Sequence, residues 1–172
     1  MVDAGIRFAD CTLDNYDATD NPAAMAACRE MADGNLSGLL LSGGVGRGKT
    51  HLLLGIGRAF EREVIRGESF VDERGYRKLH PDTPARTVAY WPVLDLIGSL
   101  RAETANHETG IIEGFCISAS LFLLDDLGAE RTTDVALEAI ERIVDRRYRA
   151  MAPMAVATNL GLAALVDKYG DR

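Results

Sequence analysis

The residues best suited to do chemistry form the run 43–50, which reads Gly-Gly-Val-Gly-Arg-Gly-Lys-Thr. Glycines adopt backbone angles closed to other residues, so the amide groups of such a loop can turn inward around a phosphate. Lys49 would reach the β- and γ-phosphates, and the Thr50 hydroxyl would ligate Mg²⁺. We therefore predict a polyphosphate site. Its predicted binding residues are Gly44, Val45, Gly46, Arg47, Gly48, Lys49, Thr50 and His51.

Two adjacent carboxylates form the second candidate group. Leu121-Phe122-Leu123-Leu124 is an apolar run that ends in Asp125 and Asp126, the form of a Walker B motif. We predict that Asp125 binds Mg²⁺ through its water shell and that Asp126 orients the attacking water. A turn or a helix N-cap is the alternative interpretation of two such acids, and the preceding phosphate loop favours the metal site.

A third candidate follows another apolar run. Asn159 ends the segment Ala155-Val156-Ala157-Thr158, where parallel sheets present side chains for binding. An amide at that point can contact both the γ-phosphate and the attacking water, so we predict that Asn159 senses the γ-phosphate. Asparagine is also a common turn residue at the end of a strand, which is the alternative.

The elements that position these residues alternate between strands and helices, so we predict an α/β fold with a parallel sheet. Short apolar runs bounded by turn residues indicate buried parallel strands, and apolar spacing near 3.6 indicates helices. The predicted strands are 37–42, 87–91, 121–125 and 154–158, and the predicted helices are 21–33, 49–65, 92–101, 108–116 and 133–150. The last helix is expected to turn Val135, Ile140, Ile143, Val144 and Tyr148 inward.

The amino-acid composition limits which kinds of protein this chain can be. The chain has 172 residues, about one domain, with 47% hydrophobic residues and a formal net charge of −7. With this net negative charge, the chain has no overall positive field that could hold a polyanion nonspecifically. The polar start of the chain and the lack of a long apolar run predict a cytoplasmic protein without a membrane partner. The scattered histidines predict no structural metal, and Cys11, Cys28 and Cys116 are expected to be buried thiols.

The segment 67–86 interrupts the alternating pattern with glycine, proline and mixed charge. Phe70-Val71 and Tyr76 flank Asp-Glu-Arg-Gly like the arms of a small hairpin. We predict a surface insertion there within a single domain that covers 1–172.

These motifs together resemble the AAA+ ATPases of the DnaC/IstB-like branch, which includes helicase loaders and transposition helper ATPases. The resemblance covers nearly the whole chain. It rests on the phosphate loop and on these further motifs: Arg7-Phe8-Ala9-Asp10, Asn21-Pro22, Leu124-Asp125-Asp126-Leu127-Gly128-Ala129-Glu130, Asp145-Arg146-Arg147-Tyr148, Thr158-Asn159-Leu160 and Tyr169-Gly170-Asp171-Arg172. It implies a P-loop NTPase with a three-layer parallel sheet, ATP and Mg²⁺ as cofactors, and a homo-oligomer that forms on ATP and DNA binding.

The resemblance also implies partners and site residues. A neighbouring subunit's arginine would complete each site, and Arg172 begins the arginine-bearing motif, although an unpaired tail arginine is the interpretation we favour. The partner would be a replicative helicase or a transposase. Phe8 would flank the adenine, or it would pack as a hydrophobic staple on the first helix. The segment after the second strand would contact single-stranded DNA.

The chain departs from the family pattern in three ways. A fifth strand and a helical lid would follow Arg172, so we predict a truncated core whose strand 38–42 is a sheet edge, unless helix 21–33 covers it. The segment 87–120 carries one basic and four acidic residues and offers only Tyr90, Trp91 and Phe115 for stacking. We therefore predict weak, salt-sensitive DNA binding. The first 21 residues are too few for a helicase-gripping module.

The function that these residues predict is ATP binding and slow ATP hydrolysis by a helicase-loader-like protein of DNA replication. An IstB-like transposition helper is one alternative. A P-loop small-molecule kinase and a scaffold whose associations ATP controls are the others.

Overall fold

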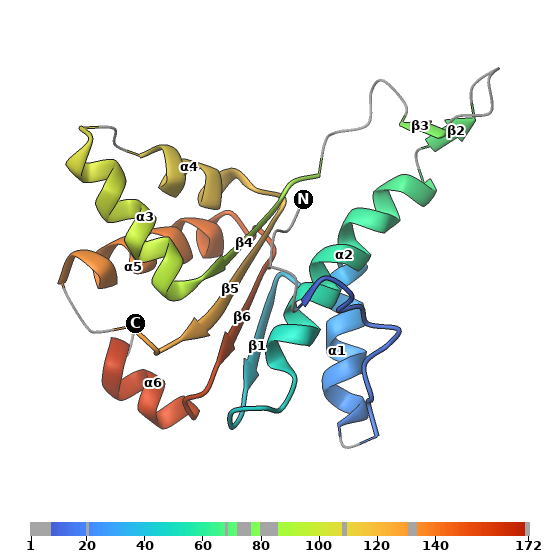
Figure 1. Cartoon of the computed structure of the whole chain (residues 1–172), viewed down its shortest axis with the longest axis horizontal. Helices are drawn as coiled ribbons and strands as arrows, with labels where there is room; N and C mark the ends of the chain where they lie inside the picture. Colours follow the sequence, from blue (N-terminus) through green and yellow to red (C-terminus); the bar gives the residue numbers. More distant parts are fainter. Residues whose placement is uncertain are drawn as a thin grey trace.

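The computed structural model describes residues 8–19, 21–67, 69–71, 77–79, 86–107, 110–130 and 134–170. Its main sheet has four parallel strands in the order β1-β6-β5-β4 (Figure 1). The strands are β1 (Gly38–Ser42), β4 (Val88–Pro92), β5 (Leu121–Leu127) and β6 (Met154–Thr158). Strands that lie far apart in sequence are therefore neighbours, and their carboxyl ends meet at one edge of the sheet.

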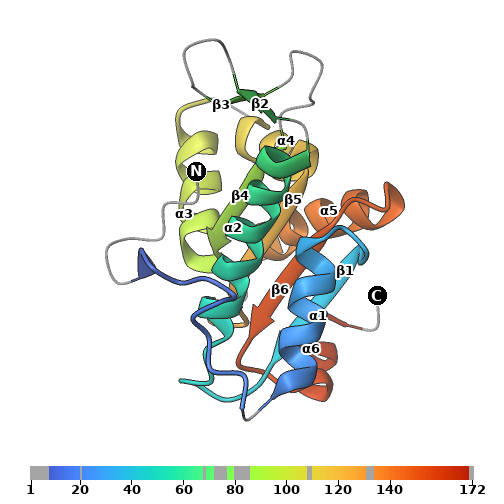
Figure 2. The same ribbon diagram turned by 90° about the vertical axis from the view of Figure 1, so that its right-hand side faces the viewer.

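Helices cover both faces of this sheet, which gives the predicted α/β architecture (Figures 1 and 2). One apolar cluster joins α1 and α2 to one face, and a second joins α3, α4 and α5 to the other. The helices are α1 (Pro22–Ala32), α2 (Lys49–Gly67), α3 (Val93–Ala105), α4 (Ile111–Ser118), α5 (Asp134–Arg149) and α6 (Leu162–Tyr169).

Local sequence explains where the predicted elements begin. The Asn21 side chain accepts from the amide of Ala24 at 3.0 Å, and Pro22 occupies the first turn, so α1 starts where the cap predicts. The apolar stripe of α2 is buried at Leu52, Leu53, Ile56 and Phe60, which have helical spacing. The strand predicted at 154–158 has those bounds, and the other strands differ from prediction by one or two residues.

Strand β1 pairs only with β6 in the described part of the chain, so it is the edge predicted above. Helix α1 lies against the face that bears Leu39 and Leu41. Leu40 points to the opposite face and remains 43% exposed. The continuous leucine run therefore belongs to an edge strand with one well-covered face, and the prediction of a fully buried strand at this position was wrong.

Two more expectations need correction. Tyr148 was predicted to face the core but is 70% exposed, whereas Ile140 and Ile143 of the same helix are buried. Helix α6 was not predicted, although Leu162, Leu165, Val166 and Tyr169 have helical apolar spacing; Gly161, which precedes its first residue, provides no side-chain cap, and none of its residues is fully buried. The predicted inward position of Val135 lies outside the residues whose side chains are described.

The region of the predicted insertion contains an antiparallel hairpin. Strands β2 (Ser69–Val71) and β3 (Arg77–Leu79) pair with each other past the end of α2, away from the main sheet (Figure 2). The first arm matches the prediction, and the second lies just after the predicted Tyr76. That 67–86 is a surface insertion, and that 1–172 is one domain, stay predictions.

The three cysteines are buried and free, as expected for small apolar residues. Burial raises the pKa of Cys28 to about 11 and that of Cys116 to about 12, so both thiols stay protonated near neutral pH. Among the described residues, none of the helices combines the length and the apolar character needed to cross a bilayer.

Arg147 is a buried cation that neutral groups stabilise. Its guanidinium is fully buried and donates to the carbonyl oxygens of Cys116, Ile117, Ala119 and Pro153 at 2.6–2.9 Å. These contacts join the end of α4 to the start of β6. Arg147 belongs to one of the motifs that carry the family resemblance, and its role in the structure is to hold the core together.

Candidate functional site

The phosphate loop joins β1 to α2, which is the placement that the sequence predicts. Gly46 and Gly48 have φ of +80° and +75°, in the left-handed region that favours glycine. A Cβ on Gly48 would lie 2.6 Å from the Tyr16 ring, so this position also needs glycine for space. Helix α2 starts directly after the loop and directs its N-terminal amides and positive dipole end toward it.

The metal-site candidates lie together. The Thr50 side chain lies close enough to the Asp125 carboxylate to have a lowering effect on its pKa, although 75 residues separate the two in the chain. Asp125 is buried, at 3% exposure, and burial raises its pKa despite hydrogen bonds from Thr50 and Tyr90. None of the described lysines or arginines forms an ion pair with it. A hydroxyl and a buried, unneutralised carboxylate are oxygen donors of the kind that Mg²⁺ prefers, so these residues fit the metal.

The other three candidates form a chain of contacts. The ammonium of Lys49 donates to Asn159 Oδ1 at 2.7 Å and to the carbonyl oxygens of Gly43 and Gly44 at 2.8 and 2.9 Å. Asn159 Nδ2 then donates to Asp126 Oδ1 at 3.2 Å. The loop lysine, the strand-end amide and the second acid, predicted from three separate segments, therefore meet at the carboxyl edge of the sheet.

Asp126 has an unusual backbone. Its φ is +54°, which is uncommon for a residue other than glycine. The amide of Asp126 donates to Asp125 Oδ1 at 2.9 Å, so the two acids are held in different directions. Asp125 turns toward Thr50, whereas Asp126 turns toward Asn159. This divergence allows one acid to serve the metal and the other to face a water.

The remaining predicted binding residues play different parts. Val45 is 85% exposed at the tip of the loop. The carbonyl of Arg47 accepts from the Tyr16 hydroxyl at 3.3 Å. His51 Nε2 lies 2.9 Å from both the Thr12 carbonyl oxygen and Asn15 Oδ1. In this structure His51 holds the N-terminal segment against α2.

Sequence reasoning missed two side chains at the site. Tyr90, at the end of β4, was considered only as a stacking platform, but its hydroxyl donates to Asp125 Oδ2 at 3.0 Å. Burial and the nearby Asp125 raise the pKa of Tyr90 well above its usual value. Tyr16 is the other: it packs against Gly48 and meets His51 edge-on at 5.4 Å. The turn-rich sequence around Tyr16 contains no pattern that predicts a place at this site.

The N-terminal segment is anchored along α2 at several points. A Cβ on Gly55 would lie 2.9 Å from the backbone nitrogen of Leu13, so the two backbones approach closely. Arg58 donates to the carbonyls of Cys11 and Phe8, the latter at 2.8 Å. The predicted roles of Phe8, beside adenine or as a staple, stay predictions.

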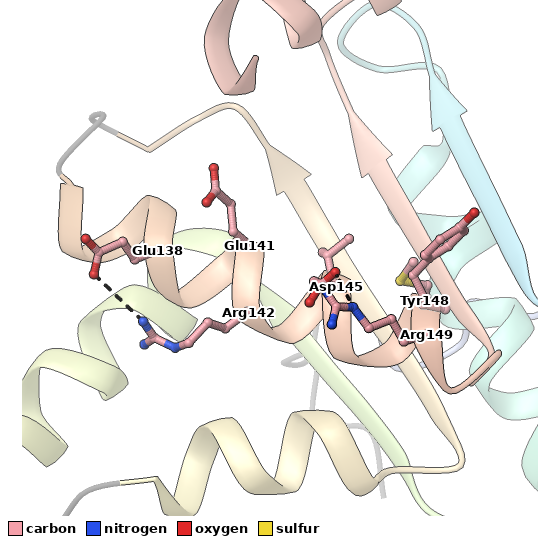
Figure 3. A pocket seen from close by; sticks show the side chains of 8 residues that line it. Glu138, Glu141, Arg142, Asp145, Tyr148 and Arg149 are labelled. Carbon is pink, nitrogen blue, oxygen red and sulfur yellow. Dashed lines mark hydrogen bonds and ion pairs between the residues drawn. The ribbon is translucent and has the colours of Figure 1, made fainter. Parts of the chain in front are cut away.

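A groove of about 730 Å³ opens beside the loop. Tyr16, Asp17 and Asn21 line it together with residues of β1 and with the loop residues from Gly43 to Lys49 other than Val45. A second hollow of about 660 Å³ lies on the outer face of α5, where Tyr148 projects from the last turn of the helix (Figure 3). None of the predicted site residues lines that second hollow.

Two curated relatives match most of the chain. It is 25% identical over 169 residues to the uncharacterized protein YdaV of Escherichia coli strain K12, and 23% identical over 178 residues to the replicative helicase loader DnaC of the same strain. These matches cover 94% and 98% of the chain but 59% and 64% of the relatives, so the chain spans about three fifths of their length. No family model matches the sequence.

Solved structures share the fold. A crystal structure of the DnaC helicase loader superposes with a TM-score of 0.75 at 23% identity, covering 97% of this chain and 91% of that one. The replication initiator DnaA bound to AMPPCP and single-stranded DNA gives a TM-score of 0.72 at 20% identity, covering 95% and 48%. The chain is therefore similar in sequence to YdaV and DnaC, and it shares the fold of the DnaC and DnaA structures.

Proposed function

We propose that the chain is an ATP-binding and ATP-hydrolysing module with a helicase-loader-like role in DNA replication. The observation that carries the proposal is the meeting of Thr50 with Asp125 beside a loop whose lysine contacts Asn159. A glycine-rich turn that binds nothing would have no need of a buried, unneutralised carboxylate beside the first turn of the helix that follows it.

In the proposed mechanism the loop amides and Lys49 hold the phosphates, and the nucleoside lies in the groove beside Tyr16. Thr50 and Asp125 would hold Mg²⁺, which when bound neutralises charge on the phosphate oxygens. Asp126 accepts a hydrogen bond from the attacking water, and Asn159 orients that water by contacting both Asp126 and the γ-phosphate. Lys49 would then exchange its bond to Asn159 for one to the phosphate.

The helicase-loader role rests on the relatives. The helicase loader DnaC matches in sequence and in fold, and the initiator DnaA was solved with an ATP analogue and single-stranded DNA. We propose a replicative helicase as the partner and head-to-tail assembly, in which a neighbour supplies an arginine. The buried Arg147 is unavailable for that purpose, and Arg172 lies outside the described residues.

Single-stranded DNA is proposed as a weak ligand. Of the three predicted stacking residues, Tyr90 and Trp91 are partly buried and Phe115 is 45% exposed. The acidic balance of 87–120 opposes a phosphate backbone, so we expect salt-sensitive binding. Binding that persists at 200 mM salt would contradict this charge argument.

The nucleotide site is tested first with Lys49→Ala and a fluorescent ATP analogue. Loss of a charge-assisted contact should weaken affinity by about 10- to 100-fold. Arg149→Ala is the matched control because it removes an exposed cation outside the site. Equal affinity of Lys49→Ala and the control would overturn the proposed site.

Turnover is tested separately with Asp126→Asn. We expect ATP binding within about twofold of wild type and little hydrolysis, since the water-orienting group is lost. Asp145→Asn, which neutralises an exposed acid on α5, should hydrolyse ATP like wild type. A loading assay with a purified replicative helicase and single-stranded DNA then tests the partner. Phosphate transfer to a nucleoside instead of water would favour the kinase alternative.

A further inference from the structure

A second buried carboxylate lies five residues after Asp125. The side chain of Glu130 is 1% exposed and accepts from three donors: the Tyr169 hydroxyl, the Lys168 ammonium at 3.0 Å and the amide of Gly128 at 2.9 Å. Lys168 also donates to the carbonyls of Gly128 and Glu130 at 2.7 and 2.8 Å. We call Glu130, Lys168 and Tyr169 the Glu130 clamp.

The clamp holds the turn that carries Asp126. The amide of Ala129 donates to the carbonyl of Asp126 at 3.0 Å, which closes the turn, and both the amide and the carbonyl of Gly128 are bound by clamp residues. A backbone with positive φ at a residue other than glycine persists only where the surroundings fix it. The bonds at Gly128 and Ala129 therefore help to keep Asp126 directed toward Asn159, together with the bond from Thr158 Oγ1 to the Leu127 carbonyl at 2.6 Å.

The clamp also holds α6. None of the side chains of this helix is fully buried, and only Leu165, Lys168 and Tyr169 are partly buried, so apolar packing contributes little to fixing its position. Its last two residues, Lys168 and Tyr169, carry the hydrogen bonds to the turn (Figure 1 shows α6 beside the end of β5). A helix attached mainly through polar contacts at one end can shift without breaking the core.

We propose that Glu130 is a positioning residue for Asp126, and that through Lys168 and Tyr169 it makes the position of α6 determine how Asp126 meets Asn159. Any event that moves α6 would then change turnover while leaving the phosphate loop intact. This inference rests on the proposed ATPase function for its catalytic consequence, whereas its structural part stands independently of turnover.

The experiment compares Glu130→Gln and Tyr169→Phe with wild type in the full chain. The first readout is hydrogen exchange at the amides of Gly128 and Ala129 without nucleotide, which should become about tenfold faster in both variants. The second is steady-state ATP hydrolysis, in which kcat should fall by about 10- to 100-fold, as for other groups that act through a contacting residue. KM and the affinity for a fluorescent ATP analogue should stay within about twofold.

Glu113→Gln is the matched control. Like Glu130→Gln, it replaces a glutamate of an ion pair between two elements with a neutral amide. The ion pair in this case joins Glu113 on α4 to Arg142 on α5 at 3.1 Å. In this control, hydrogen exchange at the amides of Gly128 and Ala129 and the value of kcat should both match wild type. Tyr169→Phe removes a single hydroxyl, so it keeps the test decisive if Glu130→Gln does not fold.

Two results would overturn the inference. One is unchanged exchange at 128–129 in a folded Tyr169→Phe variant. The other is a loss of nucleotide affinity that parallels the loss of kcat, which indicates general loosening. A wild-type chain that binds nucleotide but does not hydrolyse it would count against the proposed function, and the exchange readout would still decide whether the clamp holds the turn.

Discussion

Two buried carboxylates with opposite surroundings lie near the end of β5: Asp125 within the strand and Glu130 in the turn after it. Asp125 has a raised pKa because burial outweighs its hydrogen bonds from Thr50 and Tyr90. Glu130 is equally buried, yet its pKa is lowered: burial alone would raise it, but hydrogen bonds from Tyr169 and Lys168 outweigh that effect. The same chemical group is thus poorly neutralised at one end of a short turn and well neutralised at the other.

This difference separates a binding role from an anchoring role. A buried charge that lacks a counter-ion lowers stability, and a protein keeps it where a ligand supplies the missing charge. A buried charge with a cation and several donors holds elements together, and removing one partner leaves the other unsatisfied. Asp125 has the first pattern and suits a divalent cation, whereas Glu130 has the second and needs none.

The largest expected effect comes from Asp125→Asn. If Asp125 helps to hold Mg²⁺, turnover at saturating ATP and Mg²⁺ should fall by about 10²- to 10³-fold, as on removal of one preorganised charged group. Without Mg²⁺ the same variant should be more stable at neutral pH, by on the order of 1 kcal/mol, because a buried charge is replaced by a neutral amide of the same shape. Enzyme assays and thermal melts measure the two effects.

Loss of stability in Asp125→Asn without Mg²⁺ would contradict the contrast drawn between Asp125 and Glu130. It would mean that Thr50 and Tyr90 already satisfy the carboxylate in full, and that Asp125 resembles Glu130.

Glu130→Gln should change stability in the opposite direction. The ion pair with Lys168 is lost, and hydrogen bonds to charged groups contribute about 1.5–3 kcal/mol each. Because the Lys168 side chain is 18% exposed and water can partly replace the lost contact, we expect about 2 kcal/mol of destabilisation. Urea unfolding checks this value, with Glu113→Gln as the control for a half-exposed ion pair. If Glu130→Gln is as stable as wild type, Glu130 does not anchor these elements.

Gly128→Ala tests the turn between the two acids. Gly128 has a φ of +102°, and an added Cβ would lie 2.5 Å from Leu160 Cδ1. We expect about 1–2 kcal/mol of destabilisation from backbone strain and crowding. Gly98→Ala is the matched control because that glycine lies within α3 with no atom near its added Cβ, so it should be neutral or stabilising. Equal melting temperatures for the two variants would show that the turn is not tight.

Much of the site could be predicted from the sequence because its signals are local. The phosphate loop is a contiguous motif, and Asp125 and Asn159 each follow an apolar strand. The rule that parallel strands end at a shared edge then brings them together, and the contacts of Thr50 with Asp125 and of Lys49 with Asn159 are consistent with it. The sheet and most helix bounds were predictable for the same reason.

The rest depends on tertiary placement that no short pattern contains. Tyr148 fits the apolar stripe of α5, but it lies on the last turn of the helix, at the hollow shown in Figure 3, so the stripe alone could not reveal its exposure. The Glu130 clamp joins residues about 39 positions apart through α6, a helix that shows neither a cap nor a buried stripe. Tyr16 and Tyr90 reach the site only because separate segments fold against it.

The smallest expected effect is a difference in pH dependence. Glu130 has a lowered pKa in the folded state, so its contribution to stability is present above its ordinary value near 4.5 and is lost as the pH falls through the lower folded value. Asp125 has a raised pKa, so its cost is present at neutral pH and fades as the pH falls through the raised value toward its ordinary value of 3.8. The stability excess of Asp125→Asn over wild type should therefore shrink as the pH falls toward 3.8, and the stability deficit of Glu130→Gln should shrink as the pH falls below 4.5. Urea unfolding of the three chains at a series of pH values measures both differences, and an excess for Glu130→Gln or a deficit for Asp125→Asn at neutral pH would mean that the two carboxylates had been assigned the wrong surroundings.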